Sequence, residues 1–302
     1  MDDKELYNKK SKKRLLSINI PTFRRTVEFG RLILQISEEI TRLPIEKRAQ
    51  IIIKIFENQS EETQKKKEIV ERLTMGLTKI VWSTNSKNIG GDANIEQAYS
   101  CRLDARYIWV IGDDDQIMQN GICNVMTYLS ENKEIGLLIV RDTTYKVDKS
   151  LIEYGYWCNY SSFVKACVGA QAHMLIAHSL ISCNIVNSNI YMPTESRHER
   201  VNIASRTDLA FCFAHMKGII SGLSRDDGAC IHLLQEPVLD TSERASSSEY
   251  IAGHENVMSR LYLHHMNWIS YEFGINALEL NTKRGLMYCL PNSNLIARTI
   301  LA

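Results

Sequence analysis

The fold is decided by the stretch Tyr107-Ile108-Trp109-Val110-Ile111-Gly112-Asp113-Asp114-Asp115. Its first five residues are β-branched or aromatic, a composition that favours a buried strand. Three acidic residues follow after one glycine, and neighbouring carboxylates are costly to bury unless a cation neutralises them. The stretch therefore predicts an interior strand that delivers an acidic cluster at its carboxyl end.

Further strands and helices alternate along the first half of the chain. Apolar runs typical of strands cover residues 15–20, 51–56, 78–82 and 136–142, and helical patterns cover 24–42, 61–75, 94–106 and 116–131. This alternation predicts an α/β fold with a mostly parallel sheet flanked by helices. We expect Thr22 to cap the first of these helices.

The second half is less regular. Helical patterns cover residues 171–182, 207–217 and 249–273, and Gly218 is expected to end the second of them. Several aromatic side chains gather before these helices, where they suit either core packing or stacking on sugar rings. They are Tyr145, Tyr154, Tyr156, Trp157, Tyr160 and Phe163.

Composition narrows the class of protein. The 302 residues are 44% hydrophobic and 24% charged, which is ordinary for a globular chain with a core. A net charge of +1 gives no electrostatic case for nucleic-acid binding. The eight cysteines include no C-x-x-C pair, which indicates reduced thiols in a cytoplasmic protein. We expect neither a signal peptide nor a transmembrane helix, because no apolar run is long enough.

One basic segment stands out near the start, Lys9-Lys10-Ser11-Lys12-Lys13-Arg14. It is interpreted either as a solvated terminus or as a contact with anionic lipid at the inner face of a membrane. The second interpretation would make the protein peripheral to the membrane.

Polar residues follow several of the predicted strands: Pro21-Thr22, Glu57-Asn58, the loop 85–92 and the acidic triplet. In a parallel sheet these positions meet at one edge, where ligands bind. Carboxylates suit hard ions such as Mg²⁺ or Mn²⁺, which keep places open for phosphate oxygens. The sequence thus predicts a metal site for a nucleoside-diphosphate substrate. The alternative is a solvated acidic turn that begins the helix at residue 116.

Four motifs in sequence order carry a resemblance: Ser17-Ile18-Asn19-Ile20-Pro21-Thr22-Phe23-Arg24, Ile53-Lys54-Ile55-Phe56-Glu57-Asn58-Gln59-Ser60, Asn88-Ile89-Gly90-Gly91-Asp92-Ala93-Asn94 and Tyr107 through Asp115. Together, over roughly residues 15–140, they resemble glycosyltransferase family 2, whose members are inverting enzymes of the GT-A fold. The resemblance implies a GT-A (Rossmann-like) sheet with a more irregular helical acceptor region towards the C-terminus.

The resemblance implies a role for each member of the triplet. Asp115 is the direct ligand of Mg²⁺ or Mn²⁺, and Asp113 lies near the sugar or ribose and shares the metal. Asp114 is the variable middle position. The donor is then a UDP-, GDP- or dTDP-sugar.

The resemblance also implies donor contacts outside the triplet. Glu57 accepts hydrogen bonds from the base or ribose, and Arg24 is a candidate for the diphosphate because guanidinium matches phosphate geometry. The remaining donor-binding positions are in two loops: Pro21, Thr22, Asn88 and Asp92.

An inverting transfer needs a base near the acceptor hydroxyl. Asp208 is the candidate, because the run from Arg206 to Gly218 resembles the family's helix on the acceptor side; a helix-capping aspartate is the alternative. Glu195 and Glu199 are competing bases. Some enzymes of this fold complete the metal site with a distant histidine, for which the candidates are His232 and His254.

These observations predict four segments: a basic N-terminal segment (1–14), a nucleotide-sugar-binding half (15–142), an acceptor-binding half of the same domain (143–240) and a C-terminal helical extension (241–302). The expected activity is inverting transfer to a hydroxyl of a glycan or lipid-linked acceptor in bacterial surface polysaccharide or glycolipid assembly. The alternatives are a metal-dependent nucleotidyltransferase, disfavoured by the lack of glycine after the first strand, and a non-catalytic nucleotide-sugar-binding protein.

Overall fold

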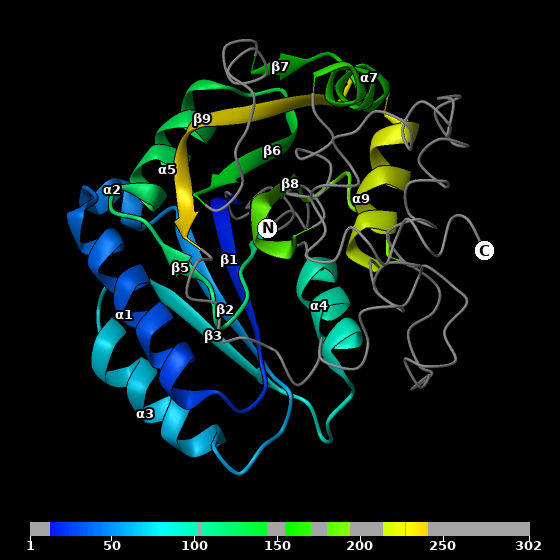
Figure 1. Cartoon of the computed structure of the whole chain (residues 1–302). Helices are drawn as coiled ribbons and strands as arrows, with labels where there is room; N and C mark the ends of the chain where they lie inside the picture. Colours follow the sequence, from blue (N-terminus) through cyan, green and yellow to red (C-terminus); the bar gives the residue numbers. More distant parts are fainter. Residues whose placement is uncertain are drawn as a thin grey trace, which may run out of the picture.

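The computed structural model describes residues 13–101, 104–143, 155–170, 180–193, 214–226 and 228–240 (Figure 1). The first half contains β1 (Arg14–Thr22), α1 (Thr26–Arg42), α2 (Ile45–Arg48), β2 (Ile51–Glu57), α3 (Thr63–Thr74), β3 (Lys79–Thr84), α4 (Gly91–Ser100), β4 (Ala105–Val110), β5 (Gln116–Ile117), α5 (Gly121–Glu131) and β6 (Ile135–Asp142). The second half contains β7 (Tyr156–Trp157), α7 (Tyr160–Ala170), η1 (Ile181–Cys183), β8 (Asn184–Asn187), α9 (Ala214–Arg225) and β9 (Cys230–Asp240). The predicted α/β class is confirmed.

The strands form one sheet in the order β3-β2-β1-β4-β8-β6-β9-β5, with β7 paired to β9. The strands β3, β2, β1 and β4 are parallel, and Ile18 in β1 lies between Ile53 in β2 and Trp109 in β4. Strand β8 is antiparallel to both β4 and β6, so the far part of the sheet is mixed. The parallel part brings the ends of β1 to β4 to one edge.

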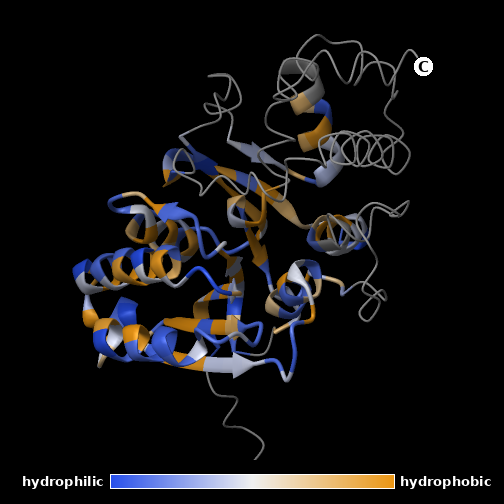
Figure 2. Cartoon of the chain, turned by 60° about the horizontal axis from the view of Figure 1, so that its bottom comes forward, coloured by the Kyte–Doolittle hydropathy of each residue, from blue (hydrophilic) through white to orange (hydrophobic). Residues whose placement is uncertain are grey.

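Helices cover both faces of this sheet and produce two hydrophobic cores. In β4 successive side chains alternate: Tyr107 and Trp109 belong to the core under α1 and α5, and Ile108 and Val110 belong to the core under α4, α7 and α9. Hydrophobic colour in Figure 2 accordingly concentrates on the strands between the helical layers. Burial on both faces explains why the strand reads as a continuous apolar run.

Two predicted helices have different bounds. The helix expected at 94–106 begins earlier, at Gly91, and ends at Ser100, because Arg106 already belongs to β4. The helix expected at 116–131 begins at Gly121, because Gln116 pairs with Asp240 of β9 in the short strand β5. A partner strand far along the chain overrides the local helical pattern.

Two helices begin under carboxylates supplied by other elements. The expected cap Thr22 lies inside β1, and Arg25 occupies the N-cap of α1 without a side-chain bond. Instead Glu62 accepts hydrogen bonds from the backbone N–H and the hydroxyl of Thr26. In the same way Glu39 of α1 accepts from the N–H groups of Asn120 and Ile122 at the start of α5. The negative charges suit the positive ends of the helix dipoles.

Gly218 does not end a helix, so that expectation is wrong. Helix α9 runs through it to Arg225. A Cβ at Gly218 would lie 2.6 Å from the carbonyl oxygen of Met192, and one at Gly222 would lie 1.8 Å from that of Ile190. Both glycines therefore permit close helix packing. Residues 207–213 of the predicted helix, and the predicted helix at 249–273, lie outside the described residues.

Three of the aromatic residues are part of the core: Trp157, Tyr160 and Phe163 are at most 3% exposed. Tyr156 is 43% exposed, and Tyr145 and Tyr154 lie outside the described residues. The described ranges hold no helix that combines the length and the apolar character needed to cross a bilayer.

Candidate active site

The acidic triplet follows β4 and folds back into the protein. Asp113 is 6% exposed and Asp115 is fully buried. A Cβ on Gly112 would meet the Asp115 carboxylate at 2.9 Å and the Asp114 carboxylate at 3.2 Å, so a side chain at this position would force the carboxylates to shift. Because the carboxylates are buried and α5 begins only at Gly121, the alternative of a solvated turn that begins a helix at residue 116 is wrong.

Strand β1 supplies the groups that hold Asp113. The two strands are paired, and the N–H of Ile111 donates to the carbonyl of Asn19. This register puts the end of β1 beside the triplet: the Thr22 hydroxyl donates to Asp113 Oδ2 at 2.8 Å, and the Phe23 N–H approaches the same oxygen at 3.4 Å. The predicted convergence of the strand ends is therefore seen for β1 and β4.

Arg25 is the residue that sequence reasoning missed. Its guanidinium lies 3.2 Å from Asp113 Oδ1 and 2.8 Å from Asp114 Oδ2, and it is 40% exposed. The predicted phosphate-binding Arg24 instead pairs with Glu61 at 3.6 Å, and both of those side chains are more than half exposed. Both arginines have positive φ, which is uncommon for residues other than glycine, and no sequence signal distinguishes which of the two faces the triplet.

The electrostatics of Asp113 follow from this setting. Burial raises the pKa of Asp113 to about 6, and the Arg25 guanidinium and the Thr22 hydroxyl oppose that rise. Burial lowers the pKa of Arg25, but Asp113 and Asp114 outweigh it, so that the pKa of Arg25 is raised. Desolvation therefore outweighs the favourable partners of Asp113, whereas the two carboxylates outweigh the desolvation of Arg25.

Asp115 faces a different partner. Its Oδ2 accepts hydrogen bonds from the hydroxyl of Ser182 and from the N–H of Gly112 at 3.2 Å. The Gly112 N–H also donates to Ser182 Oγ at 3.0 Å. Ser182, in the short helix η1, is a second residue that the sequence did not indicate. The triplet is thus divided: Asp113 and Asp114 form ion pairs with Arg25, and Asp115 accepts a hydrogen bond from Ser182.

The donor set fits a hard divalent ion by its chemistry. Asp113 and Asp115 offer carboxylate oxygens at a buried strand end, and Mg²⁺ is usually bound by one or two carboxylates together with substrate phosphates. Within the described part of the chain, no three or more His, Cys, Asp or Glu side chains group around a possible metal position. The candidate ligand His232 contacts Tyr128 at 2.9 Å and packs on Tyr156, and His254 lies outside the described residues.

Glu57 occupies an inward position at the end of β2. It is fully buried, and its Oε2 pairs with the equally buried Lys66 ammonium at 3.0 Å. Its Oε1 accepts from the hydroxyls of Ser60 and Thr63. Lys66 also donates to Thr22 at 3.0 Å, which connects Glu57 to the triplet. The contact of Glu57 with a base stays a prediction, since both carboxylate oxygens already have protein donors.

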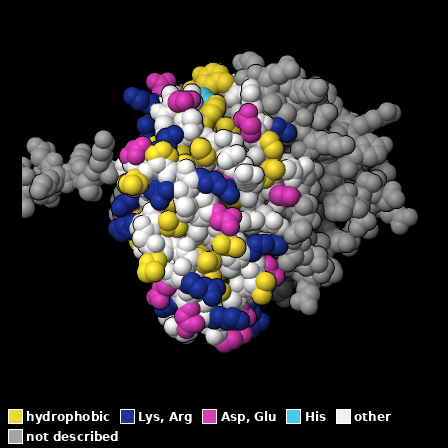
Figure 3. All heavy atoms as spheres, turned by 90° about the vertical axis from the view of Figure 1, so that its left-hand side faces the viewer, with side chains coloured by type: hydrophobic (Ala, Val, Ile, Leu, Met, Phe, Trp, Pro, Cys, Tyr) yellow, Lys and Arg dark blue, Asp and Glu magenta, His cyan; other side chains and the backbone are white. Residues whose placement is uncertain are grey.

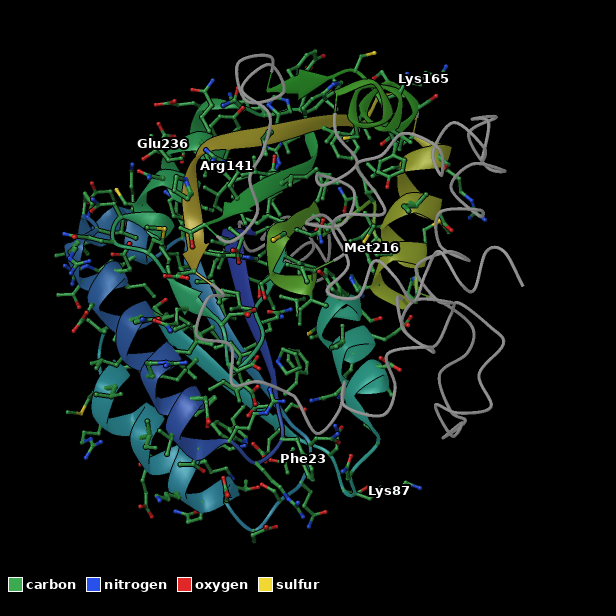
Figure 4. The ribbon with its side chains drawn as sticks, in the orientation of Figure 1. Phe23, Lys87, Arg141, Lys165, Met216 and Glu236 are labelled. Atoms are coloured by element: carbon green, nitrogen blue, oxygen red, sulfur yellow. The ribbon has the colours of Figure 1, made fainter. Side chains whose placement is uncertain are left out.

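The loop after β3 is organised by asparagines. Asn58, at the end of β2, donates to Asn88 Oδ1 at 2.8 Å and accepts from the N–H of Ile89. Asp92 lies in the first turn of α4. Phe23 and Lys87, labelled in Figure 4, mark the turn after β1 and this loop at the same end of the sheet. The predicted loop positions therefore lie at the edge that carries the triplet.

The candidate base Asp208 and the competing Glu195 and Glu199 lie outside the described residues, as does most of the basic N-terminal segment. Arg14, the last residue of that segment, begins β1.

Solved structures share this fold. Residues 1–349 of S. aureus TarS match with a TM-score of 0.51 and 10% identity, over 93% of this chain and 83% of that one. The mannosyltransferase PcManGT from Pyrobaculum calidifontis, in complex with GDP-Man and Mn²⁺, matches with a TM-score of 0.53 and 10% identity, over 97% and 76%. No protein-family model matches the sequence, and neither does any curated protein. The likeness establishes a GT-A-like fold.

Proposed function

We propose that this protein is a glycosyltransferase that uses a nucleotide-sugar donor. The observation that carries the proposal is the buried acidic triplet after β4, joined to the turn after β1 through Thr22 and Arg25. Buried carboxylates at the carboxyl edge of a parallel sheet are suited to a metal–diphosphate ligand. The similar fold of a mannosyltransferase bound to GDP-Man and Mn²⁺ supports the same assignment.

In this proposal Asp115 and Asp113 hold Mg²⁺ or Mn²⁺. The ion would supply positive charge for the leaving diphosphate. The chain's own residues prepare the site: Ser182 orients Asp115, and Thr22 orients Asp113. Because these partners are buried, the carboxylates need little reorganisation when the ligand arrives.

The donor-binding surface consists of residues on the neighbouring strand ends. The sugar or ribose lies near Asp113 and Asp114, and the nucleotide lies along the turn after β1 and the loop after β3. The residues proposed for it are Pro21, Thr22, Arg24, Asn88 and Asp92. Glu57 reaches a base only if its pair with Lys66 opens.

The finer activity follows the resemblance to family 2. Transfer proceeds with inversion, and Asp208, or else Glu195 or Glu199, deprotonates the acceptor hydroxyl. The acceptor is a glycan or lipid-linked sugar in bacterial surface polysaccharide or glycolipid assembly. The protein acts in the cytoplasm, with the segment Lys9–Arg14 as its contact to the inner face of the membrane.

The proposal is tested by binding and turnover together. UDP-, GDP- and dTDP-sugars are screened for their effect on the thermal unfolding temperature of the protein, with and without Mn²⁺. Slow hydrolysis of each sugar donor is measured as the amount of nucleoside diphosphate released. Asp115→Asn should lose the Mn²⁺-dependent stabilisation and hydrolysis. Asp104→Asn is a matched change just before the other end of β4, and it should keep both.

The outcomes separate the alternatives. A nucleotidyltransferase would instead release pyrophosphate when it is given a nucleoside triphosphate and a sugar 1-phosphate, and binding of a nucleotide sugar without turnover on any acceptor would indicate a non-catalytic binding protein. If no nucleotide sugar stabilises the protein, or if Asp115→Asn responds like the unchanged protein, the proposal is wrong.

A further inference from the structure

Arg25 occupies the carboxylates that a divalent ion at the triplet would also need. Its guanidinium bridges Asp113 and Asp114 with distances of 3.2 and 2.8 Å. A divalent ion at Asp113 and Asp115 would need the negative charge that Arg25 now neutralises. Two cations that share a carboxylate repel each other and compete for its oxygens.

The geometry of the turn makes Arg25 suited to a change of partner. It has φ 55° at the N-cap of α1, outside both the strand and the helix. The side chain is 40% exposed, whereas the Asp113 side chain is 8% exposed. The buried Asp113 carboxylate thus accepts hydrogen bonds at the end of β1, from the Thr22 hydroxyl and more weakly from the Phe23 N–H, and the partly exposed Arg25 contacts it through its other oxygen. Guanidinium binds phosphate oxygens in the same two-pronged way as carboxylates.

We infer that Arg25 is an internal counter-cation of the triplet that competes with the divalent ion and is released to the donor's diphosphate when the metal–nucleotide complex binds. The inference rests on the proposed function and adds a positioning residue to it. No covalent bond is made or broken in the exchange: Arg25 would leave Asp113 and Asp114, Asp113 would then be available to hold the metal, and the guanidinium would pair with the diphosphate.

The exchange predicts opposite effects of removing Arg25 on two affinities, that for the metal alone and that for a nucleoside diphosphate with metal. Removing Arg25 should strengthen binding of the metal alone, because its competitor is gone. It should weaken binding of a nucleoside diphosphate in the presence of metal, because one phosphate contact is gone. A residue that only supports the fold would weaken both. Coupling between sites of this kind usually amounts to about 5- to 150-fold in affinity.

The neighbouring residue Arg24 provides a matched control. Arg24→Gln removes the same charge from the adjacent residue, whose partner is the exposed Glu61. Arg25→Gln is the test, and Arg25→Lys keeps the charge but loses the fork geometry, so it should keep most of the competition with metal. Thermal unfolding without ligand checks that each variant is folded.

Free Mn²⁺ is titrated by electron paramagnetic resonance, first with protein alone and then with UDP and GDP. We expect Arg25→Gln to bind Mn²⁺ at least about fivefold more tightly without nucleotide and to bind the diphosphates at least about fivefold more weakly with Mn²⁺. Arg24→Gln should match the unchanged protein in the metal titration.

The result that overturns the inference is Mn²⁺ binding by Arg25→Gln that is unchanged, weaker or undetectable without nucleotide. That result leaves the proposed function standing if nucleotide sugars still bind. Conversely, failure of every nucleotide sugar to bind overturns the proposed function, while the titration with metal alone still decides whether Arg25 competes for the triplet.

Discussion

The buried pair between Lys66 and Glu57 permits a quantitative test of how the candidate site is held together. Both side chains are fully buried, and the ammonium lies 3.0 Å from Glu57 Oε2 and from Thr22 Oγ1. Lys66→Met keeps a similar volume and removes only the charge, so little cavity cost is added. The change leaves the Glu57 carboxylate buried without a counter-charge.

The magnitude follows from what remains around Glu57. Removing one partner of a buried ion pair costs about 3–5 kcal/mol in unfolding free energy. The hydroxyls of Ser60 and Thr63 still donate to Oε1, which places the expected loss near the lower end, about 3 kcal/mol. Glu57→Gln combined with Lys66→Met removes both charges, and the double variant should return to within about 1.5 kcal/mol of the unchanged protein.

Lys54→Met is the matched control. Lys54 is also a buried lysine, in the strand β2 that ends at Glu57, but its partner Asp104 is 45% exposed and stays hydrated when the lysine is removed. We expect a loss of only about 0–1 kcal/mol. Urea unfolding followed by circular dichroism gives all four free energies. Equal losses for Lys54→Met and Lys66→Met, or a loss below about 1 kcal/mol for Lys66→Met, would refute the reasoning.

Three further predictions concern other parts of the molecule. Gly222→Ala should cost at least about 1–3 kcal/mol in urea unfolding, because its Cβ would meet the Ile190 carbonyl at 1.8 Å. Ser182→Ala removes a hydrogen bond to buried Asp115 and should lower Mn²⁺-dependent nucleotide-sugar hydrolysis without abolishing the fold, as measured by turnover and thermal unfolding. A hydrogen bond from the buried Lys54 lowers the pKa of Asp104. The stabilisation that the ionised Asp104 gives the folded state is therefore present above about pH 4 and is lost as the pH falls further. Asp104→Asn should remove this contribution to the acid dependence of the urea midpoint.

Figure 3 shows one face of the molecular surface. On the face shown, basic, acidic and hydrophobic side chains are interspersed, without a large area of one kind. Isolated changes of exposed residues, such as at Val27 or Ile45, are expected to shift the free energy of unfolding by less than about 0.5 kcal/mol.

The sequence predicted the parallel half of the sheet well because each element there carries its own local signal. Strand β4 is buried on both faces and Gly112 follows shortly after it, and α1 begins only a short turn after β1. The prediction was less accurate where pairing partners are distant, as for β5, whose two residues pair with the end of β9. Gly218 shows the same limit, since a helix-ending glycine and a packing glycine look alike in sequence.

By itself the sequence determined the class of fold and the presence of an acidic cluster at a strand end, because periodicity and residue type are local properties. Only the tertiary structure decided the partner of each polar group. It turned Arg25 rather than Arg24 towards the triplet and directed Glu57 onto Lys66. The physical reason is that such partners lie on different elements, and buried charges settle where counter-charges and hydrogen bonds from those elements compensate their desolvation.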